Sequence, residues 1–516
     1  MNFVHFLLVL WVLLVAFLGL WHAFPLRHIF YDEISFASGV LQAFETRSFL
    51  PRGAVPYGTL TFYLLMPVHA IQLAILWVLN GFSVDQVKEL VMHNLWIAFI
   101  PPRVFNAVLY CCVCLIVWQF LKQIWFNQRS QAEKIALFLL LTGNTTLVLY
   151  SHSGKMWITS IFFVLLAGIF IPKRPTLAVT MSALAFANFP IMGFFWVLTV
   201  AVLFLGGQVC WRQVLQWGAI TTLSLAVVFL INYEGILFNF SDIFAGQIPG
   251  ALDKSSQNQS ALFFDFLNKY GHTFVSTIIK VFKIYLPFLI VISVILLSKP
   301  KIHIPLRFWW SVFGIIGYIL TISLMVFSAE PDRNFRYLLP LPLLFIPLIT
   351  SLEWKQSSHL KAVVLGGGAV SAYTTIILLI TLMRTTTYEQ TIDHVRNIYN
   401  TKQTLIVSTV LEVNAELNRQ SAEMLKKYYP VLCHPLCERF LSEEDTYPGA
   451  FAGAWITKPP HFADPLTDWP PAGYHLVFIS EASTPYIDVE RGLGSYLHPS
   501  AWWPHQLGKQ IIVKDS

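Results

Sequence analysis

An acidic pair, Asp32 and Glu33, follows the first long apolar run of the chain. A carboxylate at such a place can accept the proton of a substrate hydroxyl, as a general base does. Charges this close to a membrane surface are costly unless they are used. Neighbouring residues of an extended loop point to different sides, so we expect only one of the two carboxylates to enter a site. An exposed acidic loop without chemical function is the alternative interpretation.

Arginines of a later polar segment could supply the matching positive charge. Arg333 and Arg336 stand in a cluster that also contains Glu330 and Asp332. A planar guanidinium group donates two parallel hydrogen bonds and therefore suits a phosphate group. We expect Arg336 and Arg333 to bind phosphate. The alternative is that both arginines pair with the neighbouring carboxylates and cap a helix.

A third polar turn runs from Ser151 to Lys155 between two apolar segments. In this turn Lys155 could contact a phosphate group and His152 could assist it, whereas a solvated turn is the alternative. Arg103 begins another apolar segment, directly after two prolines. A side chain that reaches back to the lipid headgroups is sufficient to explain this arginine.

The composition indicates that membrane helices position these residues. The chain has 516 residues, of which 56% are hydrophobic and 12% are charged, and its mean hydropathy is +0.61. Soluble domains carry about 25% charged residues, so we expect an α-helical polytopic membrane protein. The net charge is +6, but no basic run accompanies it, which argues against a nucleic-acid-binding protein.

We expect about 11 to 13 membrane spans, each of about 20 apolar residues, within residues 1–383. The first covers 3–23 and is too long for a cleaved signal peptide. The others lie near 58–80, 103–121, 135–150, 156–172, 176–206, 214–232, 276–298, 308–328, 338–351 and 360–383. The run 176–206 is divided at Asn188 and Pro190 into two short crossings. The segment 58–80 requires either a return crossing between 90 and 101 or a re-entrant shape.

Lysine and arginine concentrate in short loops that this arrangement places on one side, and such loops face the cytoplasm. These loops are 122–134, 173–174, 212, 299–307 and 355–361. The opposite side receives the first loop, 24–57, with interfacial helices, the loop 233–275 and the tail. We therefore expect a multi-pass protein of the plasma (inner) membrane with an extracytoplasmic tail.

The tail, residues 384–516, changes to a mixed composition that predicts a small α/β domain. Apolar runs at 405–407, 476–479 and 511–513 predict strands, and 412–428 predicts an amphipathic helix. Cys433 and Cys437 could form a disulfide in an oxidising compartment, and the sequence leaves this open. Before the tail, Gly366 to Gly368 lie inside an apolar span, where they favour close helix packing.

With these features the chain resembles the integral-membrane glycosyltransferases of the GT-C superfamily, in the branch of protein mannosyltransferases and aminoarabinose transferases. One motif is Phe30-Tyr31-Asp32-Glu33 in the first outer loop, followed by Pro56-Tyr57-Gly58. The other is Arg336 to Pro340, an Arg-Tyr-Leu-Leu-Pro element that opens a late span. The plan of many spans, residues 1–383, followed by an outer domain is also similar.

The resemblance implies transfer of a sugar, with inversion, from a polyprenyl- or dolichyl-phosphate donor to a hydroxyl of a lipid, glycan or protein on the outer face. It implies catalytic roles for Asp32 and Glu33. Arg336 and Arg333 correspond to the donor phosphate site, with Lys155 and His152 as further candidates. Branch members often carry another acidic residue in the loop that reads 151–155 here, and this loop has none. A divalent metal cofactor is therefore an open question, and Lys155 is a candidate substitute charge.

Two other functional classes fit a helical membrane protein with outer arginines. A transporter or flippase of lipid-linked glycans would also have a cavity between many spans, but such proteins often show paired halves with broken helices at matching positions. A non-catalytic subunit of a glycan-assembly complex would explain the missing acidic residue. An outer tail of this length favours the glycosyltransferase over the transporter.

Overall fold

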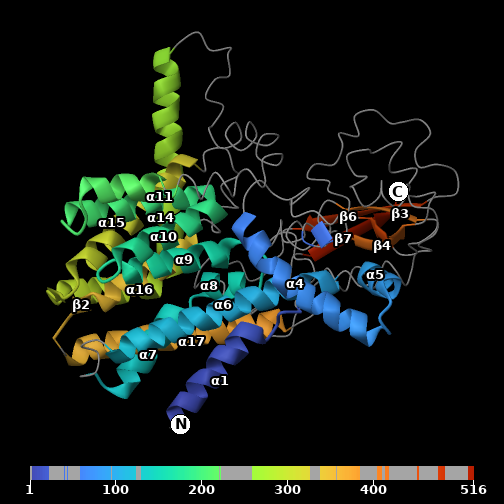
Figure 1. Cartoon of the computed structure of the whole chain (residues 1–516), viewed down its shortest axis with the longest axis horizontal. Helices are drawn as coiled ribbons and strands as arrows, with labels where there is room; N and C mark the ends of the chain where they lie inside the picture. Colours follow the sequence, from blue (N-terminus) through green and yellow to red (C-terminus); the bar gives the residue numbers. More distant parts are fainter. Residues whose placement is uncertain are drawn as a thin grey trace.

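The structure is a computed structural model in which helices form an elongated bundle and the strands that follow residue 403 lie beyond one of its ends (Figure 1). It describes residues 3–21, 40, 43–44, 59–93, 96–123, 129–219, 221, 259–325, 338–355 and 357–383, and five strand segments after residue 403. The loop 24–57 with its expected interfacial helices lies almost entirely outside the described residues.

The helices follow the apolar runs of the sequence closely. They are α1 (Phe3–Phe17), α4 (Thr59–Leu79), α5 (Val84–His93), α6 (Trp96–Gln123), α7 (Gln131–Thr142), α8 (Thr145–Ser151), α9 (Trp157–Phe170), α10 (Pro175–Asn188), α11 (Gly193–Leu205), α14 (Gln259–Leu297), α15 (Pro305–Met325), α16 (Pro340–Thr350) and α17 (Ser358–Leu382). α14 starts within the expected outer loop 233–275, and its candidate span starts at Gly271, close to the expected end of that loop. Residues 211–219 are also helical, and the rest of the expected span 214–232 falls almost wholly outside the described residues.

Five helices in the described part of the chain are long and apolar enough to cross a membrane. A sixth span results if α7 and α8, which meet at an angle of 61°, are one broken crossing. Shorter apolar helices are α1, α9, α11 and α16. The protein is therefore a helical, multi-pass membrane protein.

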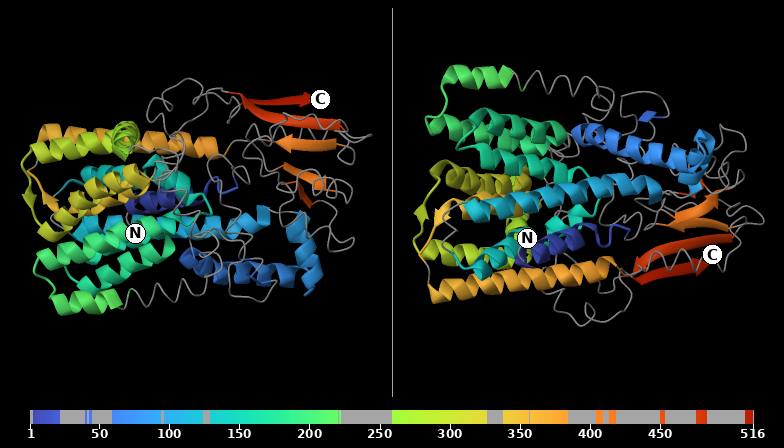
Figure 2. Two further views of the ribbon diagram at one scale, coloured as in Figure 1. Left: turned by 90° about the horizontal axis from the view of Figure 1, so that it is seen from above. Right: turned by 60° about the horizontal axis from the view of Figure 1, so that its bottom comes forward.

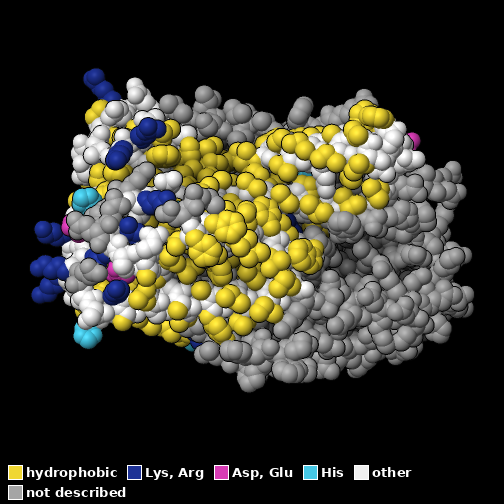
Figure 3. Space-filling view, turned by 90° about the horizontal axis from the view of Figure 1, so that it is seen from below, with side chains coloured by type: hydrophobic (Ala, Val, Ile, Leu, Met, Phe, Trp, Pro, Cys, Tyr) yellow, Lys and Arg dark blue, Asp and Glu magenta, His cyan; other side chains and the backbone are white. Residues whose placement is uncertain are grey.

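The loops rich in lysine and arginine meet at one end of the bundle, which we call the basic end. There β1 (Lys301–Ile302) pairs with β2 (Leu352–Glu353), and Arg307 donates a hydrogen bond to the carbonyl oxygen of Ile169 near the end of α9. In Figure 3 the visible Lys and Arg side chains gather at this end, beside a broad hydrophobic surface. The opposite end of the bundle is called the far end.

The run 176–206 is divided as predicted. α10 ends at Asn188, a short turn of 3-10 helix covers Pro190–Met192, and α11 begins at Gly193. The proline-rich helix α16 lies inside the bundle. All its residues are buried.

Helix α17 runs along the bundle from β2 toward the strands of the tail (Figure 2). Its glycines allow close packing, as predicted. A Cβ atom at Gly367 would lie 2.7 Å from Val291 of α14, and one at Gly368 would lie 2.6 Å from the backbone of Ala136 in α7. Larger side chains at either position would push these helices apart.

The same helix closes the break between α7 and α8. Ser371 donates a hydrogen bond to the carbonyl oxygen of Leu139 at 3.0 Å, and Thr375 donates one to that of Gly143 at 2.7 Å. A broken helix leaves carbonyl groups without partners, which is costly at membrane depth. The hydroxyl of Thr375 satisfies the carbonyl oxygen of Gly143, whereas that of Leu139 also accepts the backbone N–H of Gly143.

In the tail, β3 (Thr404–Ser408), β6 (His475–Ala482) and β7 (Gln510–Asp515) contain the three apolar runs expected to be strands. β3 is parallel to β6, and β7 is antiparallel to it. The helix expected at 412–428 is wrong at its start, because residues Val413–Leu417 form β4, which pairs with β5 (Ala450–Ala452). Pairing with a distant strand here outweighs the local helical pattern.

Candidate functional site

The structure describes two of the predicted site residues, His152 and Lys155. Both belong to the connection between α8 and α9, and only 1% and 2% of their surfaces are exposed. The solvated turn is therefore the wrong interpretation of Ser151 to Lys155. Asp32, Glu33, Arg333 and Arg336 lie outside the described residues, as do Cys433 and Cys437.

His152 ends α8 and holds the end of α1. Its Nδ1 atom lies 2.7 Å from the carbonyl oxygen of Val148, and its Nε2 atom lies 3.0 Å from that of Leu18. Leu18 directly follows α1 and begins the connection that leads to the acidic pair. The buried imidazole thus fixes the point from which the acidic loop departs.

Arg103 fixes the same loop from α6. Its guanidinium donates a hydrogen bond of 2.7 Å to the carbonyl oxygen of Leu20, and the side chain is 1% exposed. We predicted a side chain that snorkels to the headgroups, and this is wrong. The side chain points into the bundle because the end of α1 offers a carbonyl oxygen there.

Two asparagines in apolar helices complete this group. Asn106, one turn after Arg103, donates to the carbonyl oxygens of Ser153 at 2.5 Å and Lys155 at 2.8 Å. Its own oxygen is buried and has no hydrogen-bond partner among the described residues. An orphan acceptor of this kind is costly without a donor from water or a ligand.

Asn188, the last residue of α10, joins the start of α4 to the start of α9. Its oxygen accepts hydrogen bonds from the backbone and hydroxyl of Thr61, both at 2.8 Å. Its amide donates to the carbonyl oxygen of Met156 and the hydroxyl of Ser160. We define the far-end cluster as Arg103, Asn106, His152, Lys155 and Asn188.

The second predicted loop is attached at the other end of α8. Tyr285, at the kink in α14, donates a hydrogen bond of 2.8 Å to the carbonyl oxygen of Leu338. Its hydroxyl also lies 3.2 Å from that of Thr146 in the first turn of α8. Leu338 stands two residues after Arg336, so the base of the arginine loop is fixed there.

Consequently, α8 carries the bases of both predicted loops. His152, at the last turn of α8, is hydrogen-bonded to the carbonyl oxygen of Leu18. Tyr285 connects the carbonyl oxygen of Leu338 to Thr146 in the first turn of α8. A helix of seven residues has a length of about 10 Å at about 1.5 Å per residue. The acidic and arginine loops therefore start from nearby points of the bundle.

Comparison with known protein families, curated proteins and solved structures finds no match to this chain. The site must be judged on its own chemistry. The far-end cluster combines basic side chains from α6 and the α8–α9 connection with a buried amide acceptor, a combination that suits a phosphate group and a hydroxyl. Among the described residues, no group of three or more His, Cys, Asp or Glu side chains could hold a metal ion.

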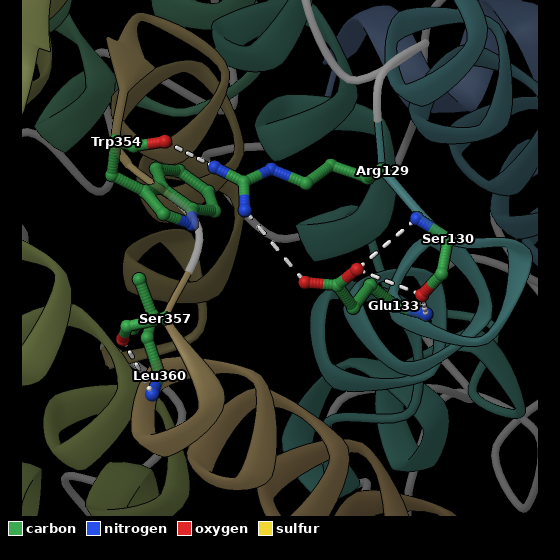
Figure 4. A network of polar contacts seen from close by, with 6 residues as sticks. All are labelled: Arg129, Ser130, Glu133, Trp354, Ser357 and Leu360. Atoms are coloured by element: carbon green, nitrogen blue, oxygen red, sulfur yellow. Dashed lines mark hydrogen bonds and ion pairs between the residues drawn. The ribbon is translucent and has the colours of Figure 1, made fainter.

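A different network occupies the basic end (Figure 4). Arg129 forms an ion pair of 3.7 Å with Glu133, donates a hydrogen bond to the carbonyl oxygen of Trp354 and lies 5.2 Å from the centre of its ring. Glu133 also accepts hydrogen bonds from Ser130, which caps α7. Burial lowers the pKa of Arg129, and the charge of Glu133 opposes this shift.

Sequence reasoning did not select Asn106, Asn188 or Tyr285 as site residues. One signal was present, because an amide inside an apolar helix is costly unless it has partners. That rule identifies Asn106 and Asn188 as buried and bonded. It does not identify Tyr285, because tyrosine is also common as an ordinary buried or interfacial side chain.

Proposed function

We propose that the chain is an integral-membrane glycosyltransferase of the GT-C type. It moves a sugar from a polyprenyl- or dolichyl-phosphate donor to an acceptor hydroxyl on the extracytoplasmic face, with inversion at the anomeric carbon. In this proposal the basic end is cytoplasmic, in keeping with the distribution of lysine and arginine in membrane proteins. The far-end cluster and the tail, residues 384–516, then face the extracytoplasmic side of the plasma (inner) membrane.

One observation supports this proposal most directly. The sequence predicts that the acidic loop and the arginine loop act together. The backbone carbonyl groups at their bases, those of Leu18 and Leu338, are connected by hydrogen bonds to the two ends of α8. Buried basic side chains, Arg103 and His152, make the attachment on the acidic side. Charged groups inside a membrane protein are expensive and usually mark a functional site.

The proposed chemistry is a single displacement. Asp32 or Glu33 takes the proton of the acceptor hydroxyl, whose oxygen forms a bond to the anomeric carbon while the bond from that carbon to the donor phosphate breaks. The lipid phosphate leaves with an additional negative charge. Arg336 and Arg333, supported by the positive charge of Lys155, stabilise this charge, while the neutral His152 holds the base of the acidic loop.

A transfer assay with the purified full chain tests the proposal. Lipid-phosphate sugars carrying a labelled sugar are supplied with membrane lipids, glycans or proteins as acceptors. Release of lipid phosphate together with labelled acceptor supports the glycosyltransferase. Movement of an intact lipid-linked glycan across proteoliposomes, without transfer, would favour the transporter instead, and the absence of both activities would favour a non-catalytic subunit.

A further inference from the structure

Arg307, in the first turn of α15, carries a buried guanidinium group at the basic end. Only 3% of its surface is exposed. One terminal nitrogen, Nη2, donates a hydrogen bond of 3.0 Å to the carbonyl oxygen of Ile169. The other two nitrogens, Nε and Nη1, are buried and have no hydrogen-bond partner among the described residues. Burial of a charged group with unused donors is costly, so this guanidinium requires a further acceptor.

The charge of Arg307 also has no carboxylate partner in the described part of the chain. The described carboxylates at the basic end are those of Glu133 and Glu353. Glu133 pairs with Arg129 at 3.7 Å, and Glu353 is exposed in β2 opposite Lys301 of β1. Helix α15 increases the excess of positive charge, because the first turn of a helix carries a partial positive charge of its own. The acceptor that fits Arg307 is therefore an anion.

The packing of α15 fixes the position of this group. Trp310 lies so close to Gly168 of α9 that a Cβ atom at the glycine would be 2.5 Å from the indole ring. The indole also donates a hydrogen bond of 3.0 Å to the hydroxyl of Thr199 in α11. The first turns of α15 are thus held against α9 and α11. A donor that is already held in place loses little conformational entropy when it binds a ligand.

The same turns of α15 also reach the lipid. Trp309 and Phe313 are 46% and 49% exposed, and their rings stack with centres 5.5 Å apart. An exposed tryptophan near the start of a span is typical of the headgroup level. The candidate span of α15 begins at Pro305, and that of α6 ends at Lys122. Arg307 therefore lies near the boundary of the hydrocarbon, where lipid phosphates are found.

We propose that Arg307 binds the phosphate group of an anionic phospholipid in the leaflet at the basic end. The guanidinium carbon lies 5.0 Å from the centre of the Phe120 ring. Phe120 is half-buried near the end of α6, and its ring turns outward to admit the phosphate to Nε and Nη1. Lys122 and the basic loop 173–174 keep the local potential positive, which favours an anionic lipid over a zwitterionic one. This site is independent of the proposed sugar transfer.

Thermal unfolding of the purified full chain in neutral detergent tests the site. Phosphatidylglycerol is the probe, and phosphatidylcholine and inorganic phosphate are the controls. The phosphatidylglycerol concentration that gives half of the maximal stabilisation should rise roughly 10- to 150-fold in Arg307→Gln, as expected for the loss of a charged hydrogen bond. Arg307→Lys should recover only part of the affinity, since lysine lacks the planar fork. Lys301→Gln removes an exposed charge from the same end and should change this concentration by no more than about twofold.

Each contrary outcome has a definite meaning. An equal response of the wild type and Arg307→Gln to phosphatidylglycerol would overturn the site, and so would an equal loss in Lys301→Gln. Stabilisation by inorganic phosphate at the same concentrations would overturn the lipid as the source of the phosphate group. Equal stabilisation by phosphatidylcholine would overturn the preference for an anionic lipid.

A second measurement uses the unmodified chain and does not depend on the folding of a variant. Phosphatidylglycerol with a diazirine on its headgroup is incorporated into proteoliposomes with the protein and irradiated. Adducts are expected on the peptides that contain Phe120 and Trp309, which flank Arg307. Adducts confined to other peptides would overturn the site.

Discussion

Both ends of the bundle bury an arginine, but they use it differently. At the basic end, Arg129 meets the carboxylate of Glu133 and the ring and carbonyl oxygen of Trp354. The network neutralises its charge and joins two loops. At the far end, Arg103 and His152 hold the chain that leaves α1, and neither segment 103–106 nor 151–155 contains a carboxylate. The basic end thus joins two loops to each other, whereas the far end holds the base of one loop.

The largest expected effect concerns the acidic loop attached to the far end. Asp32→Asn preserves size but cannot accept a proton, so sugar transfer should fall by roughly 10²–10⁴-fold. Glu33→Gln should reduce sugar transfer less than Asp32→Asn does if the side chain of Glu33 points away from the site. The measurement is transfer from labelled donor by protein whose unfolding temperature equals that of the wild type. Near-normal sugar transfer by both variants would show that this loop does not carry the catalytic base.

A second prediction contrasts arginines associated with the two ends. Arg336→Ala should weaken binding of the lipid-phosphate donor by about 1.5–3 kcal/mol, roughly 10- to 150-fold, because a charged hydrogen bond is lost. Arg336→Lys should recover only part of this, since lysine lacks the planar fork. Arg129→Lys is the control and should leave donor affinity unchanged in a direct binding assay. Equal loss in Arg129→Lys would contradict the division between the ends.

The third prediction concerns stability at the basic end. Glu133→Gln leaves Arg129 without its carboxylate but keeps an acceptor for Ser130, so it should lower the free energy of unfolding by about 1–3 kcal/mol. Glu133→Ala should add the loss of the helix cap, about 0.5–2 kcal/mol. Thermal unfolding in detergent measures both effects. Donor affinity should remain unchanged, and a loss of affinity would mean that this network also serves the site.

The smallest expected effect comes from Tyr285→Phe. The ring is kept while the hydrogen bonds to Leu338 and Thr146 are lost, at a cost of about 0.5–1.5 kcal/mol. If Tyr285 positions the base of the arginine loop, KM for the donor should rise while kcat changes little. Tyr110→Phe removes a comparable buried bond, to the carbonyl oxygen of Thr142, and should not raise KM. An equal rise in both variants would assign Tyr285 a general structural role.

The lengths of the apolar runs, and the polar, proline and glycine residues that interrupt them, predicted much of the bundle. They placed the division at Asn188 and Pro190, the close packing at Gly367 and Gly368 and the gathering of basic loops. These features depend on neighbours in the sequence or on side-chain size. Apolarity alone, however, does not distinguish a helix that runs within the bundle from one such as α4 that extends from its far end.

The polar partners at the far end could not be predicted in the same way. Arg103 looked like a residue that reaches the headgroups, yet its hydrogen-bond partner is Leu20, and the partner of Asn188 is Thr61. Each bond joins residues that are distant in the sequence, so local patterns do not specify it. The sequence singled out His152 and Lys155 for their charge, and it did not predict that both would be buried.

The break between α7 and α8 has a consequence for biosynthesis. The hydroxyl group that satisfies the carbonyl oxygen of Gly143 at this break belongs to Thr375, 232 residues away. A nascent chain therefore inserts the broken segment long before α17 leaves the ribosome, and the carbonyl group of Gly143 must meanwhile be shielded by water or by the insertion machinery. A chain truncated before Ser358 should enter the membrane but fail to assemble, and quality-control proteases should remove it.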